Sequence, residues 1–181
     1  MNKDMKNIFN TTSDETNRSE ARHASSVKTF LKDLIITVTV TVLLFKVILA
    51  IGYISGDSMY PTMKDRQTYI GQNLFYTPQY NDIIVARHAD GFHFVKRIIA
   101  MEGDTVYIDE NGIVFVNDSP VNDEYVVNKS TFQGLASEPV VVPDGHIFVL
   151  GDNRAVSMDS RYKEIGFVSV KDVECGILFC F

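Results

Sequence analysis

The longest apolar run in the sequence lies near its N-terminus. Residues 34–54 read LIITVTVTVLLFKVILAIGYI, and Lys46 is the one charge among these 21 residues. A helix needs about 20 apolar residues to cross the hydrocarbon core of a bilayer. We therefore predict a transmembrane helix over residues 28–50. The Thr-Val alternation at 37–42 also has the period of a strand, so a buried core segment is the alternative.

Polar residues fill the segment before this run. Residues 1–27 are rich in Asn, Ser and Thr, which predicts a disordered tail. Arg22, Lys28 and Lys32 lie at the start of the predicted span, and basic residues mark the cytoplasmic side of a membrane. We expect a single-pass protein of the cell membrane, with a cytoplasmic N-terminus and the rest of the chain on the outer face. A cleavable signal peptide is the alternative, although its polar leader would be unusually long.

Short apolar runs follow one another from residue 67 onward. They are rich in Val, Ile, Tyr and Phe, which strands favour, and turn signals such as Asp-Glu-Asn-Gly at 109–112 and Asp-Gly at 144–145 separate them. Residues 51–181 are therefore predicted to form a mostly β, antiparallel domain, irregular over 122–138. The expected strands lie at 68–75, 82–87, 92–101, 105–109, 113–117, 139–142, 146–150 and 176–181.

Charge and composition narrow the possible functions. Lys and Arg number 17 against 23 Asp and Glu, and this acidic balance argues against a nucleic-acid binder. Two cysteines exclude a disulfide-rich scaffold and a four-cysteine zinc site, and the four histidines lack the HExxH spacing. We expect no metal and no cofactor. Cys175 and Cys180 are expected to be free thiols on opposite faces of a strand.

A serine in a small-residue turn follows the apolar run. Residues 52–63 read GYISGDSMYPTM, with Gly56 before Ser58 and Pro61 fixing the backbone after it. A rigid turn that presents a hydroxyl suits a nucleophile, although most serines in such turns only form the turn. None of the four histidines lies in a distinctive motif that would make it the base for this serine.

A lysine is the alternative base. In GFHFVKRIIAM (91–101), strand alternation places Phe94, Lys96 and Ile98 on one face. Apolar surroundings lower the pKa of a lysine, and a neutral amine can take the proton of a serine. The alternative is a lysine at the rim of a sheet that reaches into solvent.

A dense polar cluster follows the apolar strand HIFVL. It reads GDNRAVSMDSR over residues 151–161, and an extended chain would place Ser157, Asp159 and Arg161 on one face. Asp159 and Arg161 are then able to pair, and Ser157 to hydrogen-bond a neighbour such as Lys96. A polar loop with a surface ion pair is the alternative.

These segments together resemble the type I signal peptidases, membrane-bound Ser/Lys proteases, and most of all their short Gram-positive-type members. SGDSMYPTM (55–63) resembles the nucleophile box, DIIVAR (82–87) the second strand box, FVKRIIAMEGD (94–104) the lysine box and GDNRAVSMDSR the last box. Their order and the anchor before them also match, and the resemblance covers residues 30–175.

The resemblance implies a role for each matching residue. Ser58 is the nucleophile, Lys96 the general base, and Ser157 orients the lysine. Asp159 and Arg161 form a supporting ion pair, and Arg97 and Asp152 have structural roles. Some members carry a serine at the position of Gly56 and use its hydroxyl in the oxyanion hole, so the second donor is open here.

The resemblance also implies a substrate. An apolar groove takes the end of a signal peptide as an added strand, with small residues, typically alanine (A-x-A), one and three positions before the cut. The residues expected to line its shallow pockets are Ile54, Ser55, Met59 and Val95. The implied partners are preprotein signal peptides emerging from the secretion translocon and the lipid bilayer, with no nucleic acid.

Two other functions compete with this interpretation. A self-cleaving repressor with Ser/Lys chemistry would need a DNA-binding N-terminal domain, and residues 1–33 show no helix-turn-helix pattern. A membrane-anchored binding module that has lost catalysis predicts a missing nucleophile or base, whereas Ser58 and Lys96 are both present. A peptidase specialised for a narrow set of substrates remains within the first interpretation.

Overall fold

The structure is a computed structural model that describes residues 28–44, 48–127 and 131–181. The chain divides into two units, Met1–Lys46 and Val47–Phe181. The predicted disordered tail over residues 1–27 lies outside the described residues.

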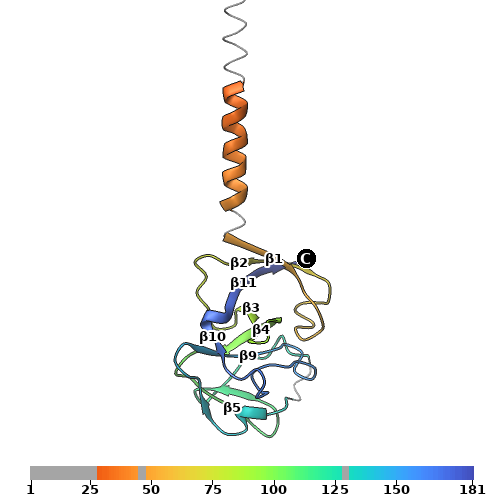
Figure 1. Cartoon of the computed structure of the whole chain (residues 1–181). Coiled ribbons are helices and arrows are strands. Elements are labelled where there is room, and N and C mark those ends of the chain that lie inside the picture. Colours follow the sequence, from red (N-terminus) through yellow and green to blue (C-terminus); the bar gives the residue numbers. More distant parts are fainter. Residues whose placement is uncertain (1–27, 45–47, 128–130) are drawn as a thin grey trace, which may run out of the picture. The chain divides into compact units, whose positions relative to one another are not determined.

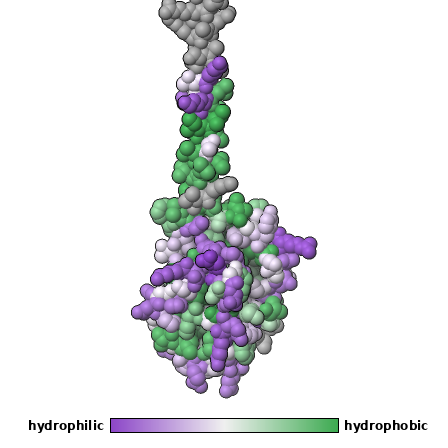
Figure 2. Space-filling model, viewed as in Figure 1, coloured by the Kyte–Doolittle hydropathy of each residue, from purple (hydrophilic) through white to green (hydrophobic). Residues whose placement is uncertain are grey.

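The described part of the first unit is an α-helix over residues 28–44 (Figure 1). Apolar side chains are exposed along it, and Figure 2 shows them on the visible face. Thr37 Oγ1 donates to the Asp33 carbonyl oxygen at 2.8 Å, so this hydroxyl is satisfied within the helix. Within the described ranges, no helix has the length and apolarity needed to cross a membrane.

The predicted helix over residues 28–50 is wrong at its C-terminal end. Leu49 and Ala50 belong to strand β1, where they pair with Gln72 and Gly71 of β2. Their backbone groups therefore bond to a neighbouring strand, which a continued helix would not allow. Residues 45–47 of the predicted span lie outside the described residues.

Seven strands of the second unit form an antiparallel sheet in the order β1-β2-β11-β3-β4-β9-β10. This order places the C-terminal strand between β2 and β3, so the two ends of the domain sequence share one sheet. The strands are β1 Leu49–Tyr53, β2 Thr68–Gln72, β3 Ile83–Arg87, β4 His93–Ala100, β9 His146–Leu150, β10 Val168–Ser169 and β11 Val173–Cys180.

A smaller antiparallel sheet has the order β7-β6-β5-β8. The predicted hairpin joins β5 to β6: the Asp109 carboxylate accepts from the N–H groups of Asn111 and Ile113, and Gly112 has φ +80°. Its strands are β5 Thr105–Ile108, β6 Val114–Val116, β7 Ser119–Pro120 and β8 Val140–Val141, and single 3₁₀ turns lie at Gly134–Ala136 and Val170–Asp172.

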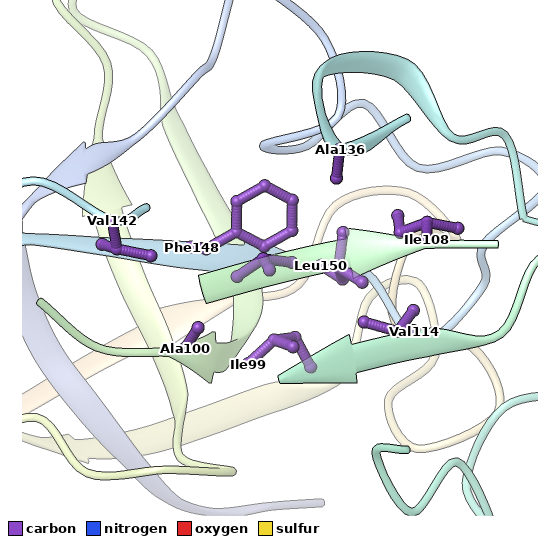
Figure 3. Close-up of a cluster of buried hydrophobic side chains, with 9 residues drawn as sticks. Ile99, Ala100, Ile108, Val114, Ala136, Val142, Phe148 and Leu150 are labelled. Carbon is purple, nitrogen blue, oxygen red and sulfur yellow. The ribbon is translucent and has the colours of Figure 1, made fainter. Parts of the chain in front are cut away.

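Three apolar clusters hold the domain together. One packs β5 and β6 of the small sheet against β4 and β9, with Phe148 at its centre (Figure 3). A second lies among β3, β4 and β9 and includes Ile84 and Ile98. The third holds Ile54, Met59 and Met63 against Val95. Ile98 and Val95 thus lie in different clusters, as the alternation of β4 predicts.

A bulge in β11 overturns the predicted placement of the two cysteines. The register shifts between Ile177 and Phe179, so Ile177 faces Gly71 and Cys180 faces Tyr69. Gly71 and Tyr69 are two residues apart on β2, which puts Cys175 and Cys180 on the same face of β11 and not on opposite faces. Both thiols are free, as expected.

The predicted strands are all present, mostly shortened by one to three residues, and residues 122–138 are irregular where described. Three strands, β1, β7 and β10, were not predicted from the sequence. β7 and β10 are two residues long, too short for an alternation to appear. β1 lies inside the apolar run and carries no pattern of its own.

Candidate active site

Ser58 lies in a turn that buried side chains attach to the core. Gly56 has φ +87°, a conformation that glycine adopts far more readily than other residues, and it allows the chain to turn just before Ser58. Three apolar side chains around the turn are at most 4% exposed and pack together: Ile54, Met59 and Met63. The turn is therefore fixed to the domain on both sides of the serine.

Lys96 reaches this serine from β4. Its Nζ lies 3.1 Å from Ser58 Oγ and 2.9 Å from the Val95 carbonyl oxygen. The residue is only 4% exposed, and its Nζ lies 5.8 Å from the centroid of the Phe94 ring. Burial lowers the pKa of Lys96 to about 8, although the nearby Asp159 carboxylate acts in the opposite direction. About half of the molecules thus carry a neutral Lys96 near pH 8.

The segment after β9 packs against the nucleophile turn. The Asn153 N–H donates to the Ser58 carbonyl oxygen at 3.0 Å, and the Asn153 side-chain amide donates to the Asp57 carbonyl oxygen at 3.1 Å. A Cβ at Gly151 would overlap both the Ser58 carbonyl oxygen and the Ser157 side chain. Residues 151–153 therefore hold the backbone on which the serine is carried.

Ser157 does not make the predicted hydrogen bond to Lys96. It is 2% exposed, and its Oγ has no hydrogen-bond partner among the described residues. The prediction assumed an extended segment, but the chain turns here and the Ser157 N–H donates to the Asn153 carbonyl oxygen at 3.1 Å. The alternation of faces in a strand therefore does not apply.

Asp159 and Arg161 form the predicted ion pair, and they form it inside the domain. Arg161 Nε lies 2.7 Å from Asp159 Oδ1, and both side chains are fully buried. Asp159 also accepts from the Gly151 N–H at 3.0 Å, and Arg161 donates to the Arg154 carbonyl oxygen at 2.8 Å. These further hydrogen bonds help to compensate the two buried charges, although Arg161 Nη1 has no hydrogen-bond partner among the described residues.

A groove of about 530 Å³ opens beside Ser58 and Lys96. β4 pairs with β3 from His93 to Arg97, whereas its pairing with β9 begins only at Arg97. No described strand covers the second edge of β4 over residues 93–96. The groove is lined by all four residues predicted to contact substrate, Ile54, Ser55, Met59 and Val95.

Comparisons with known proteins identify the family of this chain. Residues 27–181 match the family described as "Signal peptidase, peptidase S26". The chain belongs to this signal peptidase family. Signal peptidase I S of Bacillus subtilis (strain 168) is 35% identical to it over 167 residues, 86% of this chain and 89% of that protein. The probable signal peptidase I-1 of Synechocystis sp. is 36% identical over 141 residues, 71% of this chain and 69% of that protein.

The chain is also similar to a solved signal peptidase. It is a crystal structure of a signal peptidase I from Enterococcus faecalis V583, with a TM-score of 0.49 and 32% sequence identity. The match covers 57% of this chain and 98% of that chain.

A brace of polar and aromatic side chains supports the site, and the sequence motifs indicated only Arg97 and Asp152 among its members. Arg97 Nη2 lies 2.6 Å from Asp152 Oδ2, which also accepts from the Thr62 hydroxyl at 2.5 Å. The ring centroid of Tyr125 lies 4.0 Å from the Arg97 guanidinium carbon. The brace thus links the lysine strand, the nucleophile turn and the last loop. Thr62 and Tyr125 were missed.

A second buried ion pair extends the brace. Arg154 Nη2 lies 2.7 Å from Asp123 Oδ1, and the two side chains are 1% and 12% exposed. Asp123 lies in the irregular stretch, where no periodicity relates it to a residue 31 positions further on. The only available signal was that a buried arginine needs a carboxylate.

The groove also has lining residues that were missed. Val156 and Met158 flank Ser157 on either side, His93 and Phe94 lie on the strand of Lys96, and Phe92 directly precedes it. For Phe94, Val156 and Met158, the position within a recognised box was the signal that could have found them.

The described histidines form their contacts with residues other than Ser58. His88 contacts Asp90, His93 bonds to Glu174, and His146 Nδ1 lies 2.8 Å from the Asp144 carbonyl oxygen. His23 lies outside the described residues. Over residues 28–44, 48–127 and 131–181, no group of three or more His, Cys, Asp or Glu is placed to hold a metal ion.

Proposed function

We propose that the chain is a membrane-anchored serine endopeptidase that removes N-terminal signal peptides from exported preproteins, with Ser58 as nucleophile and Lys96 as general base. Membership of the signal peptidase family supports the reaction class. The observation that carries the residue roles is the buried Lys96 Nζ, 3.1 Å from Ser58 Oγ. That distance is within reach of direct proton transfer.

The chemistry begins with a neutral Lys96. Its Nζ takes the proton of Ser58 as Oγ attacks the scissile carbonyl carbon and forms a tetrahedral intermediate. The lysine ammonium then gives its proton to the leaving nitrogen, the C–N bond breaks, and an acyl-enzyme ester remains on Ser58. Water attacks this ester with Lys96 again as base, which releases the signal peptide and restores both residues.

The oxyanion of the intermediate needs donors near Ser58. The Ser58 N–H makes no hydrogen bond to any described residue and is therefore available. The Gly56 N–H donates to the Asp65 carboxylate at 2.8 Å, so we do not assign it as the second donor.

The substrate binds as an added strand along the uncovered edge of β4. Main-chain hydrogen bonds would supply affinity, and the pockets beneath would supply specificity. Ile54 and Met59 are almost fully buried around the serine, which leaves shallow pockets that suit alanine at one and three positions before the cut. Val95 and Ser55 complete these pockets.

An anchor that includes the helix over residues 28–44 would hold the peptidase at the membrane surface, with the N-terminus in the cytoplasm. From Leu34 onward the described helix carries no charged residue and exposes aliphatic side chains, which supports contact with lipid. The domain also exposes aromatic and aliphatic side chains on β1, the edge strand of its large sheet, among them Ile51 and Tyr53. Preprotein signal peptides leaving the secretion translocon would reach Ser58 there.

The test is cleavage of a preprotein with an A-x-A site by the full-length protein in detergent. We expect one cut after the second alanine, and no cut by Ser58→Ala or Lys96→Met at equal folding. Ser157→Ala should leave stability unchanged, because its hydroxyl has no hydrogen-bond partner to lose among the described residues. Substantial cleavage by Lys96→Met would refute the dyad.

The anchor has a separate test. Membranes of cells that express the full chain are washed at alkaline pH, and the protein is followed in pellet and supernatant. Leu34→Arg combined with Val38→Arg should move the protein to the supernatant, since two charges at the helix centre oppose insertion. Glu110→Arg with Glu138→Arg, both at exposed positions of the domain, is the matched control and should stay in the pellet. An unchanged pellet fraction for the helix variant would contradict the anchor.

A further inference from the structure

We infer that His93 and Glu174 form a polar subsite for the fifth substrate residue before the cut, selecting a hydrogen-bonding side chain and rejecting an apolar one. This inference rests on the proposed function and extends its substrate specificity.

The two residues meet across β3. His93 Nε2 lies 3.0 Å from Glu174 Oε1, with the histidine at the start of β4 and the glutamate near the start of β11. Their side chains are 53% and 43% exposed, so the pair is open to a ligand. His93 lines the groove, and its Nδ1 has no hydrogen-bond partner among the described residues.

The groove that His93 lines also has apolar lining residues, among them Phe92, Phe94 and Ile165. An apolar substrate side chain laid over the pair would remove water from the imidazole and the carboxylate and give no hydrogen bond in return. A side chain such as that of Gln or Ser would replace the lost water contacts. The pair therefore discriminates by penalising the wrong residue.

Strand geometry assigns the position in the substrate. In a strand, every second residue faces the same side, so Val95 and His93 share a face of β4. Val95 belongs to the pockets proposed for the small residues at one and three positions before the cut. A substrate strand that runs from His93 toward Lys96 then places the next inward-facing residue, the fifth before the cut, at His93.

Such a subsite would fix the register of the substrate. The apolar core of a signal peptide lies upstream of its polar end segment. If a slide by a few residues brings a leucine of that core onto His93 and Glu174, the misplaced complex is disfavoured. The pair would thus help to place the A-x-A sequence at Ser58.

The experiment compares two preproteins that differ only in Gln or Leu at the fifth position before the cut. The full-length enzyme in detergent cleaves each, kcat/KM is measured, and the cut is located by mass spectrometry. We expect the wild type to prefer Gln roughly tenfold. His93→Phe and Glu174→Leu, on different strands, should each reduce this preference to less than about twofold, mainly by faster cleavage of the Leu substrate.

The matched control is Asp90→Asn. Asp90 is the carboxylate partner of His88 and is 82% exposed outside the groove. The Asp90→Asn variant should keep the wild-type preference for Gln over Leu. Equal kcat/KM for the two preproteins with wild type, or an unchanged preference in both pair variants, would overturn the subsite alone. No cleavage of either preprotein by folded wild type would overturn the proposed function and this inference with it.

Discussion

Burial of one amine is the feature that makes Lys96 a usable base. A lysine in water holds its proton until about pH 10.4 and is almost fully charged at neutral pH. At 4% exposure the charged form is penalised, and the pKa of Lys96 falls to about 8. The Asp159 carboxylate favours the charged form, but its own pairing with Arg161 limits that effect. The buried ion pair therefore belongs to the electrostatics of the base.

The pH dependence of cleavage follows from this pKa. Because the deprotonated lysine is the active form, kcat/KM should rise with pH through an apparent pKa of about 8 and level off above it. The measurement is an initial-rate profile from pH 6 to 10 with an A-x-A preprotein. His93→Phe is the control, since His93 is a titratable residue that lines the same groove. A flat profile, or a rise that disappears in His93→Phe, would contradict the assignment of the base to Lys96.

Among the elements, regular strands were predictable and their junctions were not. The runs at 82–87, 92–101 and 146–150 carry β-branched and aromatic residues between turn signals, and β3, β4 and β9 lie there. Leu49 and Ala50 of β1 were predicted as helix because they continue an apolar run, and the pairing of β1 with β2 depends on a partner that periodicity does not reveal. The bulge of β11 likewise could not be predicted from the pattern of apolar and polar residues.

The contact between the last loop and the nucleophile turn gives a prediction for Gly151. A Cβ at this position would overlap the Ser58 carbonyl oxygen and the Ser157 side chain, so Gly151→Ala has to push the two segments apart. We expect Gly151→Ala to lower kcat/KM at least about a hundredfold, since small displacements of a reacting group are costly, and to lower Tm. The measurements are cleavage kinetics and thermal unfolding.

Gly91→Ala is the matched control for this change. Gly91 has φ +90° and nothing within 4 Å of an added Cβ, so the substitution costs only about 1 kcal/mol of backbone strain. Its kcat/KM should stay at the wild-type value. If Gly151→Ala cleaves as fast as Gly91→Ala, the close approach of the two segments has no role in positioning Ser58.

At the scale of the whole molecule, the site is assembled from segments that no local pattern connects. Ser58 and Lys96 are 38 residues apart, and the fold alone brings them to 3.1 Å. Alternation predicted that Lys96 would share a face with apolar residues, but its link to Ser58 came from the resemblance of several boxes taken together. Asp123 and Tyr125 lie outside those boxes, and only the folded chain shows that they hold Arg154 and Arg97.

A buried lysine with a lowered pKa also makes the stability of the domain depend on pH. The folded chain releases the Lys96 proton near pH 8, whereas the unfolded chain keeps it until about pH 10.4. Between these values unfolding takes up a proton, so the free energy of unfolding contributed by this group rises with pH through that window. A difference of more than two pKa units corresponds to about 3 kcal/mol.

Comparison with Lys96→Met isolates this contribution. Urea unfolding of both full-length proteins between pH 7 and 11 should show the wild type gaining about 3 kcal/mol relative to Lys96→Met across the window from about pH 8 to 10.4. Tyr76, whose pKa is raised by burial and by its hydrogen bond to Asp82, acts in the opposite direction at higher pH. It is present in both proteins and cancels in the difference. A constant difference between the two proteins would mean that Lys96 titrates as an exposed lysine, and the base of the proposed reaction would then have to be sought elsewhere.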